Sequence, residues 1–94
     1  MIKLPINYNI LTWQQRKQVR TEYIKLQDNK CYYCGANLYD KPDETVLKKR
    51  IDKNLFPKNF FQYSIHLHHN HNTGMTIGAV HNYCNAVLWQ YHNE

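Results

Sequence analysis

The sequence predicts a small α+β domain in which one helix is followed by a strand, a turn, a second strand and a terminal helix. Three observations predict it: apolar residues recur at helical spacing within 12–28, polar and apolar residues alternate over 63–68, and residues 82–92 contain no helix breaker. A chain of 94 residues has room for one such domain. We divide residues 1–94 into an N-terminal segment and helix (1–30), a middle segment (31–62) and a strand–strand–helix end (63–94).

The predicted N-terminal helix begins with capping chemistry. Thr12 is followed at the right spacing by Gln15 for a capping box, in which each side chain bonds to the backbone of the other residue. Val19, Tyr23 and Leu26 then recur at helical spacing, and neither Gly nor Pro interrupts the segment. We therefore expect one helix over 12–28, preceded by an irregular segment.

The middle segment has the weakest pattern. Pro42 and Pro57 bracket most of it, and a short helix over 43–50 is the one element that its composition allows. We interpret residues 36–62 as an inserted loop. After the segment 63–68, residues 70–74 have the composition of a turn, and Met75 to Val80 are expected to form the second strand.

The net positive charge favours a polyanionic partner, and nucleic acid is the first candidate. Twelve Lys and Arg residues against seven Asp and Glu residues give a net charge of +5 and a pI near 9.2. Six of these cations form two groups along the chain. For each group, one interpretation is contact with the phosphates of a nucleic acid, and the other is a solvated surface without a partner. The groups are Arg16, Lys17 and Arg20 on the predicted helix, and Lys48, Lys49 and Arg50 in the insert. The apolar runs are too short to cross a membrane, and we expect no signal peptide.

Two pairs of potential metal ligands have the same two-residue spacing. Cys31 and Cys34 form one pair, and His81 and Cys84 form the other at the start of the terminal helix. Zinc takes four such ligands in a tetrahedron, so the sequence predicts a structural Cys3His zinc site. A redox pair and free buried thiols are the alternatives. Three cysteines, an odd number, also favour a reducing compartment, the cytoplasm, over a secreted disulfide scaffold.

A histidine cluster lies at the end of the first predicted strand. His66, His68, His69 and His71 fall within six residues. Alone, such a cluster is a metal-binding tract or a surface feature without a role. Its position beside a helix that carries Asn85 in its first turn instead favours a hydrolytic site. There a divalent metal would lie between strand and helix, with a free histidine to take a proton from water.

These residues resemble an HNH endonuclease, the ββα-metal or His-Me finger family, and within it the branch of phage recombination endonuclease VII. The likeness covers roughly residues 20 to 90 without the insert. It rests on two stretches of the C-terminal half, on Gly78 between them, and on the earlier Cys31 to Gly35. The stretches are His68-His69-Asn70-His71-Asn72-Thr73-Gly74 and His81-Asn82-Tyr83-Cys84-Asn85.

The resemblance implies a metal-dependent DNA endonuclease built on a ββα-metal core with one structural zinc. It implies that His69 activates water, that His71 contacts the scissile phosphate, and that Asn85 ligates a catalytic divalent ion such as Mg²⁺ or Mn²⁺. The second ligand of this ion would be His68, and the products would carry 5′-phosphate and 3′-hydroxyl ends. Cys31, Cys34, His81 and Cys84 match the structural zinc ligands of the family.

Three positions depart from the family pattern. His68 stands where the family usually has Asp, and a neutral, softer ligand should shift the preference of the site from Mg²⁺ toward Mn²⁺, Co²⁺, Ni²⁺ or Zn²⁺. His81 replaces a Cys, which zinc tolerates. Ile77 stands where many relatives have Arg, so one phosphate contact is expected to be missing.

The alternative to an enzyme is a zinc-knuckle module that binds nucleic acid without catalysis. The positive charge and the many tyrosines fit this alternative, but it leaves His68, His69 and Asn85 unexplained. A redox or metal-sensing regulator ranks third. Within the enzyme class, nicking, homing and junction resolution all stay open, and a phage-infected host cell is the expected setting. A homodimer is considered, with Trp13, Val19 and Tyr23 either at its face or packed within the domain.

Overall fold

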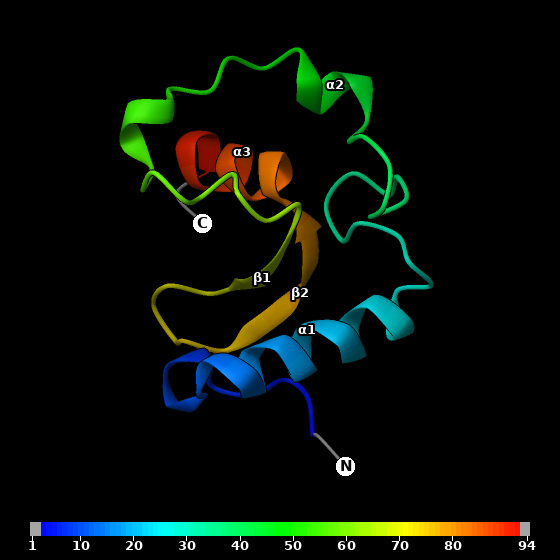
Figure 1. Cartoon of the computed structure of the whole chain (residues 1–94), viewed down its shortest axis with the longest axis vertical. Coiled ribbons are helices and arrows are strands. Elements are labelled where there is room, and N and C mark those ends of the chain that lie inside the picture. Colours follow the sequence, from blue (N-terminus) through cyan, green and yellow to red (C-terminus); the bar gives the residue numbers. More distant parts are fainter. Residues whose placement is uncertain (1–2, 93–94) are drawn as a thin grey trace.

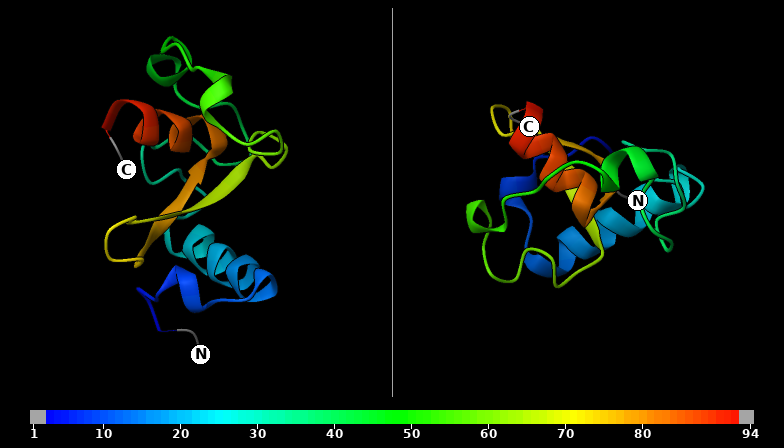
Figure 2. Two further views of the ribbon diagram at one scale, coloured as in Figure 1. Left: turned by 90° about the vertical axis from the view of Figure 1, so that its left-hand side faces the viewer. Right: turned by 90° about the horizontal axis from the view of Figure 1, so that it is seen from above.

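A computed structural model describes residues 3–92 and shows a small α+β fold (Figure 1). A two-stranded antiparallel sheet lies between one long helix and the terminal helix, and the left-hand view of Figure 2 shows the same layering from a further side. The elements in chain order are η1 (Tyr8–Ile10), α1 (Trp13–Leu26), α2 (Glu44–Leu47), η2 (Lys53–Leu55), β1 (Ile65–His69), β2 (Thr76–His81) and α3 (Asn82–His92). Within residues 3–92, no helix is both long and apolar enough to cross a bilayer.

The predicted N-terminal helix is confirmed as α1, and so is its capping box. The Gln15 backbone N–H donates to the Thr12 hydroxyl at 3.2 Å, and the Thr12 N–H donates to the Gln15 side chain at 2.8 Å. Val19 and Tyr23 are buried, whereas Leu26 is exposed at the end of the helix. Val19 and Tyr23 therefore pack within the domain, and of the three residues considered for a dimer face only Trp13 is exposed.

Both predicted strands are confirmed, each displaced by one or two residues from its expected bounds. The segment expected over 63–68 begins at Ile65 and continues to His69, and β2 runs from Thr76 to His81. The register pairs Ile65 with His81 and shifts between His68 and His69, so that His69 lies opposite Thr76. This bulge locally breaks the strict alternation of faces along β1.

The irregular N-terminal segment is an integral part of the sheet region. Thr76 N–H donates to the Ile6 carbonyl at 2.9 Å, and Tyr8 N–H donates to the Gly74 carbonyl at 2.7 Å. Asn7 pairs with Met75 in an isolated antiparallel bridge. Pro5 explains why no α-helix forms there, and the segment contains only the short 3-10 helix η1. The pairing with the start of β2 has no signal in the local sequence. Residues 6–8 therefore lie beside the hairpin turn.

The inserted loop packs closely on the terminal helix. The short α2 lies within the helix expected over 43–50 and buries Val46. Further along, the Gln90 side chain bonds to the Arg50 carbonyl and to the Asp52 N–H, both at 3.0 Å. The ring of Phe56 meets that of Trp89 with centroids 5.3 Å apart. The insert is thus a covering of α3 rather than a free loop.

The core lies where α1, the hairpin and α3 meet. Val19 from α1, Val80 from β2 and Val87 from α3 are among its fully buried members. Two cysteines, Cys31 and Cys84, belong to the same cluster. Part of the interior of this small domain is therefore made of side chains that can bind a metal.

Gly74 offers a test of how the turn holds the N-terminal segment. Its φ is +78°, and a Cβ there would lie 2.8 Å from the side chains of Asn7 and Asn9. Gly35 has the same left-handed backbone, with φ +79°, but open space around its Cβ position. We expect Gly35→Ala to lower the free energy of unfolding by about 1 kcal/mol, the cost of the backbone conformation alone.

Gly74→Ala should cost clearly more than this control, since residues 7–9 must also move. Chemical denaturation of both metal-loaded variants measures the difference. Equal losses of stability would show that the N-terminal segment is not held by the turn.

Candidate metal centre and the adjacent basic pocket

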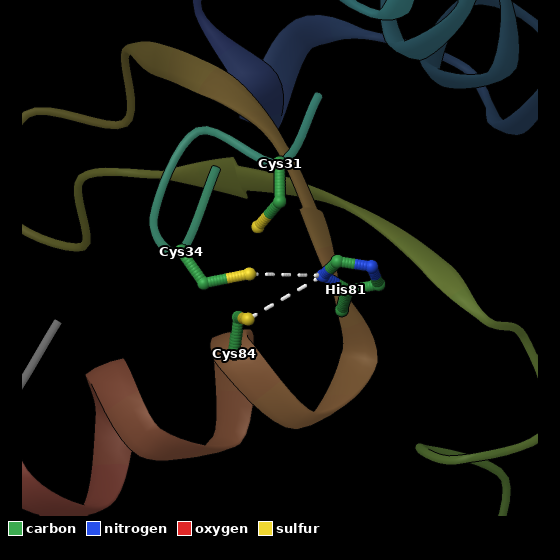
Figure 3. Close-up of side chains that lie close together, drawn as sticks. All are labelled: Cys31, Cys34, His81 and Cys84. Atoms are coloured by element: carbon green, nitrogen blue, oxygen red, sulfur yellow. Dashed lines mark hydrogen bonds between the residues drawn. The ribbon is translucent and has the colours of Figure 1, made fainter. Parts of the chain in front are cut away.

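Four side chains from three parts of the chain converge on one point. Cys31 and Cys34 come from the turn after α1, His81 from the end of β2 and Cys84 from the first turn of α3 (Figure 3). Their ligand atoms all lie within 4.8 Å of one another. The predicted Cys3His group is therefore confirmed as a cluster that is positioned to hold a metal ion.

Backbone hydrogen bonds shape the turn that carries the first pair of ligands, which we call the knuckle (residues 31–35). Gly35 N–H donates to the Cys31 carbonyl at 3.0 Å, and the left-handed conformation of Gly35 lets the chain turn back. Tyr32 N–H donates to the Ala79 carbonyl at 3.0 Å. Gln27 extends this link, because its side chain bonds to both the N–H and the carbonyl of Ala79 at 2.9 Å. The knuckle is thus tied to β2.

His81 is oriented so that one ring nitrogen faces the sulfur atoms. Its Nε2 lies 2.9 Å from the Asn37 carbonyl, so this nitrogen carries the proton and Nδ1 is left as the ligand. Nδ1 lies 3.5 Å from the sulfur atoms of both Cys34 and Cys84, as the dashed lines in Figure 3 show. A tetrahedral zinc with Zn–S bonds of about 2.3 Å and a Zn–N bond of about 2.0 Å would place such atoms about 3.5 Å apart. The separations fit that geometry.

The pKa values of two of the thiols are displaced in opposite directions. The Cys84 thiol donates a hydrogen bond to the Cys31 sulfur and lowers the pKa of Cys31 to about 4, although burial acts in the opposite direction. The same bond, with burial and the neighbouring sulfur atoms, raises the pKa of Cys84. A metal ion that takes all three thiolates must therefore displace the proton of Cys84.

A second feature is a pocket of about 360 Å³ bordered by α1, the N-terminal segment, β1 and the start of α3, which we call the basic pocket. It gathers most of the residues that the sequence suggested for catalysis and phosphate contact. These are His69, His71, Asn85, Arg16, Lys17 and Arg20. No acidic side chain is among the described residues that line it.

His69 stacks against an aromatic ring from the N-terminal segment. Its imidazole lies parallel to the ring of Tyr8, with centroids 3.9 Å apart and an interplanar angle of 6°, and the ring of His71 is 4.8 Å away. Burial, followed by the nearby His71, His68 and Arg16 charges, lowers the pKa of His69 below its ordinary value of 6.5. At neutral pH the imidazole is therefore neutral and able to accept a proton.

Tyr8 is a site residue that the sequence did not reveal. The guanidinium of Arg16 lies 3.9 Å from the Tyr8 ring centroid, and its Nε donates to the Tyr8 carbonyl at 3.3 Å. The ring thus contacts both a cation of α1 and the candidate base. No local pattern announces this contact, because it depends on the pairing of residues 6–8 with the start of β2.

His66 holds the position beside Asn85. The Asn85 amide donates to Nδ1 of His66 at 3.0 Å, and the ring of Phe60 meets the imidazole edge to face at 4.6 Å. Burial is the largest cause of a lowered His66 pKa. The sequence included His66 in the histidine cluster but assigned it no role.

His68, expected to share a metal with Asn85, lines a different hollow. It is 3% exposed and borders a cavity of about 320 Å³ with Ile77 and Leu88. His66 and His68 lie two residues apart on one strand, a step of about 7 Å. His66 meets the first turn of α3 at Asn85, whereas His68 lines a hollow with Leu88, three residues further along that helix.

The second predicted group of cations lies elsewhere. Lys48, Lys49 and Arg50 are exposed, and none of them is among the described residues that line the basic pocket. The ammonium of Lys49 lies 4.9 Å from the ring centroid of Tyr91, whose hydroxyl donates to the Arg50 carbonyl at 2.6 Å. In the structure these residues join the insert to α3.

No family model matches the sequence, and comparisons with curated proteins and with solved structures gave no match either. The assignment of function therefore depends on the chemistry of the two sites themselves.

Protonation of the cysteines predicts how metal affinity should change with pH. Because Cys84 keeps its proton at neutral pH, metal binding should release at least one proton, and affinity should rise about tenfold per pH unit for each proton released. Competition with a chromophoric chelator between about pH 6 and 8 measures this slope. An affinity that does not change with pH would contradict a raised pKa of Cys84.

Proposed function

We propose that the protein is a metal-dependent endonuclease of the HNH type that hydrolyses phosphodiester bonds in DNA. The observation that carries the proposal is the position of His69. It is a half-buried, neutral imidazole at the end of β1, in a pocket shared with Asn85 and three cations of α1. A base, a polar side chain on the following helix and phosphate-binding cations are the parts that hydrolysis of a phosphodiester requires.

The Cys3His cluster would hold a structural zinc in this enzyme. Three thiolates and one imidazole with tetrahedral separations are a usual zinc set. Asn85 directly follows the ligand Cys84 on α3. Metal binding would therefore fix the first turn of α3 and, with it, the direction of the Asn85 side chain.

The catalytic ion would be held by His66 and Asn85. The two side chains are already 3.0 Å apart, and a half-turn of the Asn85 amide would direct its oxygen toward the same point as His66 Nδ1. One nitrogen and one neutral oxygen, with no carboxylate among the described lining residues, favour Mn²⁺, Co²⁺, Ni²⁺ or Zn²⁺ over Mg²⁺. When bound, such an ion would stabilise negative charge on the phosphate and the leaving oxygen.

The side chains of the pocket would perform the remaining tasks. Arg16 and Arg20 on α1 would bind the phosphate and offset its charge. A ring nitrogen of His69 would take a proton from the attacking water, and Tyr8 would keep the ring in place through its stacking contact. His71, with its ring 4.8 Å from that of His69, would contact the same phosphate. The products would carry 5′-phosphate and 3′-hydroxyl ends.

Binding without cleavage is the second candidate function. It is favoured by one observation: the aromatic side chains of Trp13 and Tyr63 are exposed and border the pocket together with the cations. A non-catalytic nucleic-acid-binding module needs just these groups. His69 distinguishes the two candidate functions, because only an enzyme requires a free base at this position.

Substitution of His69 tests the enzyme directly. We expect the wild-type protein to nick supercoiled plasmid with Mn²⁺ or another divalent ion and not with EDTA. His69→Ala should lower the rate by about 10²- to 10⁴-fold, because the base is lost, while DNA binding is retained. Since the pKa of His69 lies below 6.5, the wild-type rate should fall only on the acidic side of that value.

A histidine outside the pocket supplies the control. His92→Ala, at the end of α3, should nick at the wild-type rate. Cleavage by His69→Ala at the wild-type rate would refute the assigned base. Absence of cleavage with every metal, with binding retained, would favour the binding module.

Two variants show which histidine, His66 or His68, is the ligand of the proposed catalytic ion. His66→Ala should raise the metal concentration needed for half-maximal nicking at least tenfold, because it removes one of two proposed ligands. His68→Ala should mainly lower the melting temperature, since His68 is buried beside Leu88. Metal titrations of the nicking rate and thermal denaturation measure both effects. If His68→Ala instead raised the required metal concentration and His66→Ala only lowered the melting temperature, His68 would be the ligand.

A further inference from the structure

We propose that the basic pocket binds an unpaired nucleobase, so that the substrates of this protein are nucleic acids with single-stranded or extruded bases. Unpaired nucleic acid would be the substrate class of the proposed nuclease, and only the cleavage step depends on nuclease activity. Aromatic side chains, cations and part of the insert together border the pocket, and these groups support the binding.

Two aromatic side chains that line the pocket are largely exposed to solvent. Trp13, the first residue of α1, is 69% exposed, and Tyr63, two residues before β1, is 53% exposed. Both line the pocket, and they come from elements far apart in the sequence. A large aromatic ring that is open to solvent beside a group of cations is the usual platform for stacking a base.

The cations are placed to hold the backbone that carries such a base. Arg16, Lys17 and Arg20 follow Trp13 by three, four and seven residues, so all four lie on one face of α1, along about 10 Å of helix. The one ion pair among residues 3–92 joins Glu22 and Lys25, away from this face. The three cations therefore keep their charge available for phosphates.

An intact duplex would make poor use of this surface. Bases within a duplex are stacked on their neighbours and present only their edges, so they cannot cover the faces of Trp13 and Tyr63. An unpaired base can enter a pocket of about 360 Å³ and stack there. Asn59, whose amide both donates and accepts hydrogen bonds, also lines the pocket and could bond to the edge of the base.

The part of the pocket that comes from the insert is held in place before any ligand binds. Phe60 packs on both His66 and Phe56, with ring centroids 4.6 Å away in each case. The Asn82 side chain donates to the Phe61 carbonyl at 3.3 Å, and its N–H donates to the Ser64 carbonyl at 2.9 Å. The segment that carries Asn59 and Tyr63 is therefore fixed to β1 and α3, which gives the insert a role in recognition.

Binding measurements with matched oligonucleotides test the proposal without cleavage. The wild-type chain has a loaded structural metal centre and no added catalytic ion, and fluorescence anisotropy follows a labelled single strand, the same strand with abasic sites in place of its bases, and the corresponding duplex. We expect the single strand to bind at least tenfold more tightly than the other two, since only it offers free base faces. RNA and DNA versions of the strand show which backbone the site prefers.

Substitutions then assign the effect to the pocket. Trp13→Ala and Tyr63→Ala should each weaken binding of the single strand at least fivefold and leave binding of the abasic strand unchanged. Tyr39→Ala is the matched control, because Tyr39 is 68% exposed but is not among the described residues that line the pocket. It should bind as the parent does. Thermal denaturation confirms that each variant is folded.

Tryptophan fluorescence gives an independent measurement of base stacking in the pocket. Trp89→Phe leaves Trp13 as the only tryptophan, and its emission should be quenched by the single strand and not by the abasic strand. Equal affinity for the strands with and without bases, or for the duplex, would overturn the proposal. So would equal effects of the Trp13 and Tyr39 substitutions.

The two proposals fail in different ways. Plasmid that is never nicked, with base-dependent binding intact, would refute the nuclease and support the base pocket. Nicking by the wild-type chain without any dependence of binding on bases would refute the base pocket alone.

Discussion

Convergence of four ligands on one point is the constraint on which the rest of this fold depends. The knuckle, the end of β2 and the start of α3 all contribute a side chain to the cluster, and Cys31 and Cys84 are at the same time members of the core. In a domain of this size the apolar interior is modest, so a metal ion bound there would contribute a large share of the folding energy. The direction of α3, and hence of Asn85, follows from that junction.

The basic pocket is assembled from segments that lie far apart in the sequence. The N-terminal segment supplies Tyr8, α1 supplies the cations, the insert supplies Asn59, and the short stretch before β1 supplies Tyr63. Neither the N-terminal segment nor the insert has a regular structure of its own over most of its length. Each is held by a few specific contacts, which is how short irregular chain can form a defined surface.

The parts of this structure that could be predicted are those with a local cause. The capping box defines the start of α1, the two-residue spacing of Cys31 and Cys34 identifies the knuckle, and the run without breakers predicts α3. The role of Tyr8 and the exchange of His66 for His68 beside Asn85 could not be predicted. These features depend on the bulge in β1, on the pairing of residues 6–8 with the start of β2, and on which turn of α3 lies beside which residue of β1. All three are set by tertiary contacts.

Gln27 has a further consequence for the behaviour of the protein in solution. A hairpin of two strands leaves outward-facing backbone groups on β2, and such an edge invites pairing with another chain. The Gln27 side chain occupies both groups of Ala79, and Ile6 occupies the N–H of Thr76. One amide side chain thus stands in for a third strand and caps part of the edge at which another chain would pair.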